Sequence, residues 1–267
     1  MWNGLKGIGR DLLPKHYQVP VKYWYCWLRG ALEDEMKLLE LLVRSHDLVV
    51  DVGGNRGIYA YQFWRLGARV EVFEPNPACS RVLSAWAAGK AGVNVHSVAL
   101  SSHSGSANLH IPIDESGIEH DSSASIENTG FGRSHDEWVP LQTRDSFGFE
   151  DVSLIKIDVE GHEYSVIEGA GATLAASRPA LLVEIEQRHA NRPIGEVFAK
   201  IKGYGYQGYF IGVDGMAALE SFDVARHQSM EHFGTSKGEY INNFLFLHRD
   251  RLADGEYAPL VGGQLLK

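Results

Sequence analysis

The stretch "VVDVGGNRGIY", residues 49–59, runs from a short apolar segment into an acid and then through three glycines. Its β-branched valines are typical of a strand that is buried on both faces. Gly53, Gly54 and Gly57 allow the backbone to turn tightly and a ligand to come close to it. A strand that ends in such a turn and leads into a helix often holds a nucleotide. The stretch therefore predicts an α/β fold with a ligand at the carboxyl end of this strand.

The sequence around this stretch alternates between strand and helix patterns. Apolar runs predict strands at 48–52, 69–74, 93–100, 153–160 and 179–186. Helical spacing follows at 58–66, 77–89, 164–175 and 193–202, and an amphipathic helix at 31–44 precedes the first strand. Two later runs, 206–213 and 242–249, predict an antiparallel pair. The alternation indicates a doubly wound, mostly parallel sheet with helices on both faces.

Composition and length narrow the class of protein. The chain has 267 residues, of which 44% are apolar and 22% are charged, as in ordinary soluble proteins. A net charge of −9 argues against a nucleic-acid partner, because phosphate binding depends on Lys and Arg. Cys26 and Cys79 cannot form a disulfide framework. No apolar run approaches the roughly 20 residues of a membrane span, and charges interrupt any signal-peptide core. We therefore expect a cytoplasmic protein.

Three regions fall outside the regular alternation. We expect an N-terminal helical segment at 1–44, one domain at 45–250 with an inserted loop at about 101–152, and a tail at 251–267. Residues 1–30 have apolar residues at helical spacing with basic residues between them. They either touch a membrane surface or acidic partner, or pack on their own domain or on a second copy in a homodimer; we favour packing. In the insert, short strands at 106–113 and 137–143 flank a polar loop, 114–136, which is either a lid over the ligand or a disordered surface loop.

Asp51 decides which kind of ligand the glycine turn suits. A carboxylate at the end of this strand would repel a pyrophosphate and attract a cation. S-adenosylmethionine carries an ammonium and a sulfonium and has no phosphate, so it fits. We expect Asp51 to attract the ammonium and to contact the backbone N–H groups of Gly57 and Ile58 at the start of the next helix. The alternative is that Asp51 only caps that helix.

A second acid, Glu74, ends the next strand in "EVFEPNP" at the same edge of the sheet. An acid at this position can accept hydrogen bonds from both ribose hydroxyls of an adenosine. Pro75 then turns the chain, and Asn76 either reaches the adenine or caps the following helix. Because NAD-binding proteins use a similar acid, an NAD-dependent dehydrogenase remains an alternative.

Four segments, "DVGGNRG", "FEPNP", "VALSSHSG" and "IKIDVEGHE", resemble the FkbM family of S-adenosylmethionine-dependent methyltransferases over about residues 45–190. The resemblance implies the seven-stranded class I methyltransferase fold, with strand order 3-2-1-4-5-7-6 and strand 7 antiparallel. It also implies O-methylation of a sugar or polyketide-type hydroxyl in a glycan or natural-product pathway. Within these segments we expect Gly53, Asn55, Ala99 and Leu100 to line the donor site.

The "IDVEGHE" run gathers four ionisable residues at the end of the fourth strand. Asp158 is expected near the donor, and Glu160 near the reacting groups. His162 is our preferred general base, because imidazole readily accepts a proton near neutral pH and Gly161 would lift it from the sheet. The alternative is that the acids serve the dipole of the next helix and that His162 is merely exposed.

The fifth strand ends in "VEIEQRH", which places Glu184 and Glu186 on one face with His189 just beyond them. These side chains, with Ser123 of the polar loop, are expected to contact a small-molecule or glycan acceptor. Glu184 and Glu186 could also hold an arginine, and Asp158 with Glu184 could ligate Mg²⁺, although we do not favour a metal. An alternative of another class is a non-catalytic, cofactor-binding subunit. Nucleic-acid base methylases typically carry an Asn/Asp-Pro-Pro-aromatic run after the fourth strand. This chain has "DVEGH" there, which argues against a nucleic-acid substrate.

Overall fold

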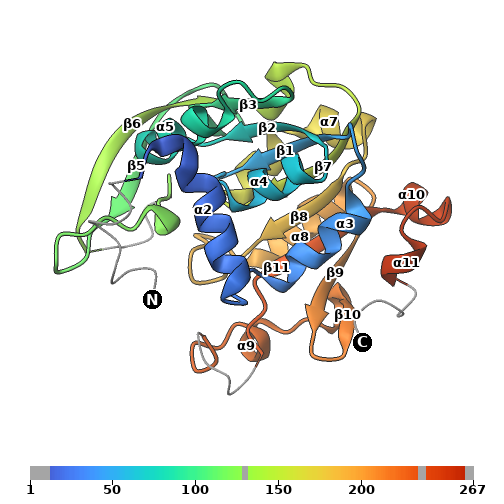
Figure 1. Ribbon diagram of the computed structural model, residues 1–267. Coiled ribbons are helices and arrows are strands. Elements are labelled where there is room, and N and C mark those ends of the chain that lie inside the picture. Colours follow the sequence, from blue (N-terminus) through green and yellow to red (C-terminus); the bar gives the residue numbers. More distant parts are fainter. Residues whose placement is uncertain (1–12, 128–131, 234–238, 262–267) are drawn as a thin grey trace.

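The computed structural model describes residues 13–127, 132–233 and 239–261, and a central eight-stranded sheet organises them (Figure 1). The strand order is β10-β9-β11-β8-β7-β1-β2-β3. The strands are β1 Leu48–Val52, β2 Arg69–Phe73, β3 Val93–His96, β7 Val152–Ile157, β8 Ala180–Glu184, β9 Tyr206–Gly212, β10 Gly215–Ala218 and β11 Asn243–His248. The five strands from β3 to β8 are parallel, and β11 is antiparallel to both its neighbours. The predicted doubly wound sheet and the order 3-2-1-4-5-7-6 are confirmed.

The eighth strand was not expected. After β9 the chain reverses at Val213 and Asp214, and β10 pairs back on β9 as an antiparallel hairpin at the edge of the sheet. The predicted seven-stranded sheet is therefore extended by one short edge strand, far from the glycine turn.

Helices cover both faces of the sheet. On one face lie α2 Lys15–Leu28, α3 Leu39–Leu42, α4 Ile58–Arg65 and α5 Pro77–Ala87, with Phe63 and Trp86 among the largest buried side chains. On the other lie α6 Glu163–Glu168, α7 Gly171–Ala176 and α8 Ile194–Gly203, packed against Phe244 and Phe246. The remaining helical segments are η1 Asp34–Leu38, η2 Asp121–Ser123, η3 Arg144–Phe147, η4 Leu219–Ser221, α9 Val224–His227, α10 Arg249–Ala253 and α11 Ala258–Val261.

Three predicted elements are divided in the structure. The helix expected at 31–44 is the 3-10 turn η1 followed by the single turn α3, because the backbone is extended at Glu33, where its carboxylate meets the Tyr59 hydroxyl. The strand expected at 93–100 breaks after His96 and resumes as β4 Ala99–Leu100 in another sheet. The helix expected at 164–175 breaks near Gly169, where a Cβ would lie only 2.0 Å from the Ser101 carbonyl oxygen.

The insert forms a small sheet of its own, in the order β4-β6-β5. β5 Gly105–Pro112 and β6 Ser134–Gln142 are antiparallel and contain the two strands predicted here, while β4 is parallel to β6. Figure 1 shows this sheet projecting at one end of the central sheet. Between β5 and β6 the chain returns toward the glycine turn through η2.

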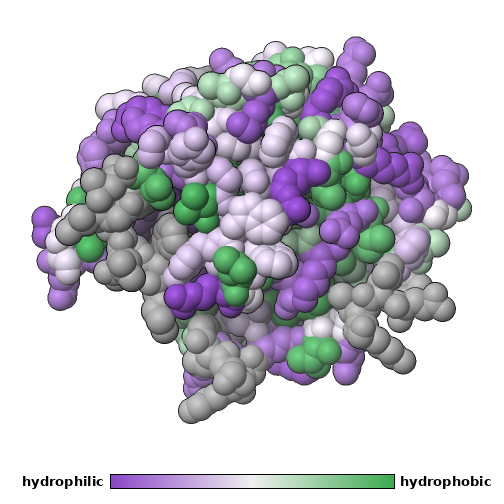
Figure 2. All heavy atoms as spheres, viewed as in Figure 1, coloured by the Kyte–Doolittle hydropathy of each residue, from purple (hydrophilic) through white to green (hydrophobic). Residues whose placement is uncertain are grey.

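The N-terminal helix α2 packs on its own domain, as we favoured. Val19 and Tyr23 are buried against α4 and α5, and the Tyr23 hydroxyl donates to Gln62 Oε1 at 2.5 Å. Its outward face exposes aromatic and aliphatic side chains, and Figure 2 shows pale and green atoms over it; these residues are Tyr17, Val21, Trp24, Trp27 and Leu28. Contact of this face with a membrane or a second copy stays a prediction. The part of the prediction on residues 1–12 lies outside the described residues. None of the helices in the described ranges is both long and apolar enough to cross a bilayer.

Candidate active site

The glycine turn after β1 is shaped by close contacts with its neighbours. Gly53 has φ +81°, and a Cβ on it would lie 1.8 Å from the Asp158 carbonyl oxygen. Only glycine therefore lets the ends of β1 and β7 come this close. Gly57 has φ +79° and precedes α4; its Cβ would lie 3.0 Å from a methyl group of Val19. Helix α2 thus rests directly on the glycine turn.

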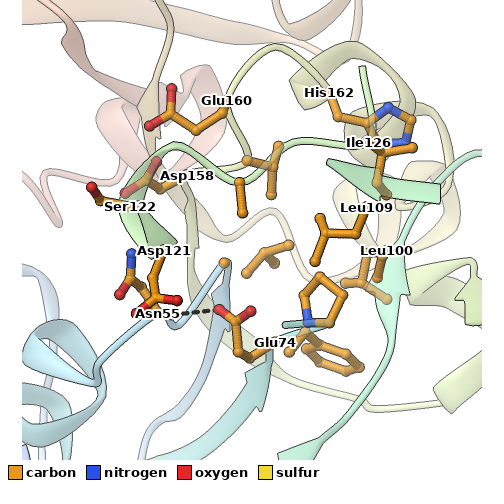
Figure 3. A pocket seen from close by; sticks show the side chains of 17 residues that line it. Asn55, Glu74, Leu100, Leu109, Asp121, Ser122, Ile126, Asp158, Glu160 and His162 are labelled. Carbon is orange, nitrogen blue, oxygen red and sulfur yellow. Dashed lines mark hydrogen bonds between the residues drawn. The ribbon is translucent and has the colours of Figure 1, made fainter. Parts of the chain in front are cut away.

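Two adjoining cavities open at the carboxyl ends of the parallel strands. The first lies between Glu74, Pro75, Leu100, Leu109 and Ile126, and Figure 3 shows it from close by. The second lies between the glycine turn, α2 and β7. Both are lined by five common residues, Gly53, Asn55, Ser122, Asp158 and Glu160. The expected donor residues Asn55, Pro75, Ala99 and Leu100 line the first cavity, and Ile58 lines the second.

Asp51 lines the second cavity from the end of β1 and is only 2% exposed. It accepts a hydrogen bond from the backbone N–H of Ala60, further along α4 than the expected Gly57 and Ile58. Its Oδ2 has no hydrogen-bond partner among the described residues. Burial raises the pKa of Asp51 to about 7, and the nearby Asp158 adds to the rise while Lys156 opposes it. The buried oxygen is thus available to a hydrogen-bond donor, ideally a cationic one.

Glu74 reaches into the first cavity from the end of β2. Its Oε2 accepts from the backbone N–H of Asn55 at 2.6 Å, and its Oε1 accepts from that of Asn76 at 2.7 Å (Figure 3 shows the first bond). Burial raises the pKa of Glu74 to about 7. Each oxygen has a second lone pair, so the carboxylate is held in place and can still accept from two hydroxyls.

Asn76 does not line either cavity. Its Oδ1 accepts from the backbone N–H of Ala78 at 2.9 Å and caps α5, and its Nδ2 donates to Asp121 at 3.2 Å. Of the two expected roles for Asn76, the structure therefore shows the cap and not an adenine contact.

The end of β7 carries a cluster of acids around one buried lysine. Lys156 is 1% exposed, and its Nζ lies 3.9 Å from Asp158 Oδ2 and 4.9 Å from the centre of the Tyr59 ring. Burial disfavours its charge, but Asp158 and Glu184 outweigh this and raise the pKa of Lys156. Burial also raises the pKa of Asp158 and of Glu184, and the two carboxyl groups share a hydrogen bond.

Glu160 lies where the two cavities meet. Its backbone has φ +50°, a conformation that is uncommon for a residue with a side chain. Burial, and then the Asp158 charge, raise the pKa of Glu160 to about 8. Its Oε2 lies 3.2 Å from His189 Nε2, so the expected acceptor residue His189 stands behind Glu160 and does not itself line a cavity.

His162 lines the first cavity; it lies at the start of α6, just after Gly161, whose φ is +101°. Its side chain is buried; Nδ1 lies 2.7 Å from Glu127 Oε1, and Nε2 lies 3.0 Å from Ser101 Oγ. Both ring nitrogens are therefore engaged, and the lone pair that a general base needs is already used. This geometry counts against His162 as the base and favours a positioning role between the insert and β4.

Glu184 and Glu186, the two acids at the end of the fifth parallel strand, have different surroundings. Glu184 lines the second cavity and accepts from Asn242 Nδ2 at 2.7 Å. Glu186 lines neither cavity, because Arg188 holds it through Nε at 2.5 Å and through Nη2 at 3.0 Å. The expectation that Glu186 binds an acceptor is therefore replaced by the alternative that it holds an arginine. In the described part of the chain, no three His, Cys, Asp or Glu side chains are grouped to hold a metal ion.

The loop between β5 and β6 forms a wall of the crevice. Arg56 Nε donates to Asp121 Oδ2 at 3.1 Å, and Ser125 Oγ donates to the Glu160 carbonyl oxygen at 2.6 Å. Ser122 lines both cavities, whereas the expected Ser123 lines neither. In the described residues 114–127 this loop therefore contacts the glycine turn and the end of β7, and its role as a lid stays a prediction.

The family model of the methyltransferase FkbM domain matches residues 51–207. The chain belongs to the FkbM methyltransferase family. A curated relative, the 2-O-methyltransferase NoeI of Sinorhizobium fredii, is 27% identical over 165 residues, which cover 56% of this chain and 68% of NoeI. Among solved structures, an FkbM methyltransferase from Methylobacillus flagellatus is 14% identical with a TM-score of 0.47; the match covers 87% of this chain and 56% of that one. A TehB-like S-adenosylmethionine-dependent methyltransferase from Corynebacterium glutamicum is 12% identical with a TM-score of 0.41, covering 87% and 98%.

The crevice of this FkbM methyltransferase fits S-adenosylmethionine, the donor of the family. Three carboxyl groups, those of Asp51, Glu74 and Asp158, surround the glycine turn. They would repel the diphosphate of NAD, and family membership rules out the dehydrogenase alternative. The unpartnered Asp51 Oδ2 suits the ammonium of the donor, and Glu74 suits its ribose.

Sequence reasoning missed three cations of the site, Lys22, Arg56 and Lys156, which all line the second cavity. A lysine within the apolar run "SLIKI" was a usable signal, because a buried strand seldom carries a charge without a partner. Arg56 lies within the glycine turn itself, so its sequence position already indicated that it could reach the site. Lys22 gave no signal, because nothing in the sequence shows that α2 lies over the turn.

Proposed function

We propose that this FkbM methyltransferase methylates a hydroxyl group of a sugar in a glycan or natural product. The observation that carries the proposal is the set of five residues common to both cavities: none is aromatic, and Ser122, Asp158 and Glu160 offer hydroxyl and carboxyl groups. Such groups recognise hydroxyls, whereas flipped nucleobases are gripped by stacking. The name of the relative NoeI, a 2-O-methyltransferase, supports the same class of reaction.

S-adenosylmethionine supplies an activated methyl group, so the protein has two tasks, to align the acceptor and to remove its proton. Alignment of two reactants can contribute roughly 7–11 kcal/mol, and a general base about 10²–10⁴-fold. Glu160 is the proposed base: it lies where the cavities meet, and its raised pKa gives it high proton affinity. His189 Nε2 lies 3.2 Å from Oε2, but burial lowers the pKa of His189, so the proton should stay on Glu160.

The other acids would hold the reacting groups. Asp158 and Glu184, which are linked by a hydrogen bond and face Lys156, are proposed to accept from acceptor hydroxyls or from the donor's ammonium. A small-molecule or glycan acceptor, the absence of a nucleic-acid partner and a cytoplasmic location all stay predictions, as does the alternative of a non-catalytic cofactor-binding subunit.

A transfer assay tests the proposal. The purified protein and isotope-labelled S-adenosylmethionine are incubated with a panel of free sugars, nucleotide sugars, glycan fragments and hydroxylated natural products. We expect label in an O-methyl ether on one sugar hydroxyl, located by mass spectrometry and NMR. Glu160→Gln should lower turnover at least a hundredfold, whereas Glu168→Gln, which removes an exposed acid of α6, should not. Label only on nitrogen or sulfur would refute the proposal, and donor binding without transfer to any acceptor would favour the non-catalytic subunit.

A further inference from the structure

Helix α2 precedes the segment that the family model matches, yet it forms part of the crevice wall. Val19 packs against Gly57 of the glycine turn. Lys22 lies three residues further along the same helix and therefore on the same side, and it lines the second cavity together with Gly53, Gly54 and Asn55. The position of Lys22 is thus fixed by the packing that seats α2 on the turn.

Lys22 has no counterion among the described residues. No hydrogen bond or ion pair joins it to another described residue, although burial lowers its pKa. The acid in its neighbourhood, Asp121, is already bound by Arg56 and by Asn76. A partly desolvated ammonium beside a cavity is costly unless an anion meets it there. The structure therefore calls for a negative group of a ligand at this point.

The same cavity also has a feature of opposite charge. Asp51 Oδ2 is buried and has no hydrogen-bond partner among the described residues, and Asp158, Glu184 and Glu33 line the same cavity. The charges that act on Asp51 include Lys156 and Asp158, whereas those that act on Lys22 include Arg56 and Asp121, so the two groups have different surroundings in one lining. A cation and an acid that both lack a partner among the described residues match a zwitterion, with its carboxylate toward Lys22 and its ammonium toward Asp51.

We propose that Lys22 binds the carboxylate of the amino-acid moiety of S-adenosylmethionine, which makes α2 part of the donor site. This inference rests on the methyltransferase function. The 51–207 region then supplies the contacts to the adenosine and the ammonium, and the helix before it supplies the contact to the carboxylate. An anionic group of the acceptor, such as a phosphate, is the competing source of negative charge.

Binding calorimetry with two ligands tests the assignment. The first ligand is S-adenosylhomocysteine, and the second is its decarboxylated analogue, which keeps the ammonium. The wild-type chain should bind the first at least tenfold more tightly. Lys22→Met should weaken S-adenosylhomocysteine at least tenfold and leave the analogue within about twofold, because a charge-assisted bond to the carboxylate is lost. Lys22→Arg should retain most of the preference.

Lys15→Met is the matched control, because Lys15 is an exposed lysine at the start of the same helix, and it should change neither affinity. Equal weakening of both ligands by Lys22→Met would mean that α2 only supports the turn, and the assignment would be wrong. If Lys22→Met leaves the affinity for S-adenosylhomocysteine unchanged and raises the KM of the acceptor, Lys22 binds an anionic group of the acceptor. That result would also overturn the assignment. Failure of the wild-type chain to bind either ligand would instead count against the methyltransferase function itself.

Discussion

Replacing Asp51 by asparagine should change stability and donor affinity in opposite directions. The carboxyl group is buried at 2% exposure, and burial raises its pKa from 3.8 to about 7. A group whose pKa is raised on folding binds protons more tightly in the folded chain than in the unfolded one. Stability is therefore lost as the pH rises from about 4 to about 7, and the loss is complete above that window.

The size of this loss follows from the pKa values. A rise from 3.8 to about 7 corresponds to on the order of 4 kcal/mol of destabilisation when Asp51 is ionised. Asparagine has nearly the same shape and no charge, so Asp51→Asn should be more stable than wild type at pH 8.5, with little difference at pH 4. The donor's ammonium should lose a hydrogen bond to a charged group, worth about 1.5–3 kcal/mol, or about 10- to 150-fold in affinity.

Urea unfolding at pH 4 and pH 8.5 measures the effect on stability, and calorimetry with S-adenosylhomocysteine at pH 6 and pH 8.5 measures the effect on affinity. Wild-type affinity should increase with pH because binding favours the ionised carboxylate, and Asp51→Asn should show a flatter profile. Glu71→Gln is the control: Glu71 is a buried acid of β2 that pairs with Asn94 and His96 and lines neither cavity. It should lower stability and leave affinity unchanged. If Asp51→Asn is less stable than wild type at pH 8.5, Lys156 compensates the charge fully and the reasoning fails.

Three further predictions concern the rest of the site. Glu74→Gln should weaken S-adenosylhomocysteine about tenfold in calorimetry and abolish any preference over its 2′-deoxyribose analogue; a retained preference would place the ribose elsewhere. His162→Ala should lower the melting temperature through two lost buried hydrogen bonds but reduce kcat less than Glu160→Gln does, and the reverse order in steady-state kinetics would restore His162 as the base. Treatment with EDTA should leave turnover within about twofold, and loss that Mg²⁺ restores would show that a metal ion takes part.

The sequence was most informative where the local hydrophobic pattern agrees with the burial that the fold imposes. The run "LVVDV" is buried at every position in β1, and the strand order followed once the family resemblance was recognised. Asp51 and Glu74 could be placed because parallel strands end at one edge of the sheet. The hairpin to β10 was missed because the predicted strand ended at Val213 and the following "DGM" was not read as a turn into another strand.

Errors concentrated where a distant segment decides the local structure. The segment "VNVHSVAL" has the pattern of one strand, but β4 leaves the central sheet to pair with β6, some forty residues later. His162 was our preferred base because its ring was expected to have a free nitrogen, and only the folded insert brings Glu127 onto that ring. Propensity and periodicity act over a few residues, so neither can report such partners.

The charges in the second cavity suggest how the donor is selected. The β-strands supply acids, and acids alone would attract any cation that reaches the sheet edge. Lys22 and Arg56 approach from α2 and from the glycine turn, and they line the same cavity as Asp51. A ligand that carries a cation without a nearby anion would leave Lys22 uncompensated, and one that carries a phosphate would meet Asp51. Each misplaced charge in a partly desolvated site costs several kcal/mol. Lys22 and Asp51 together therefore favour an adenosine that carries an amino acid over an adenosine that carries only a cation or a phosphate.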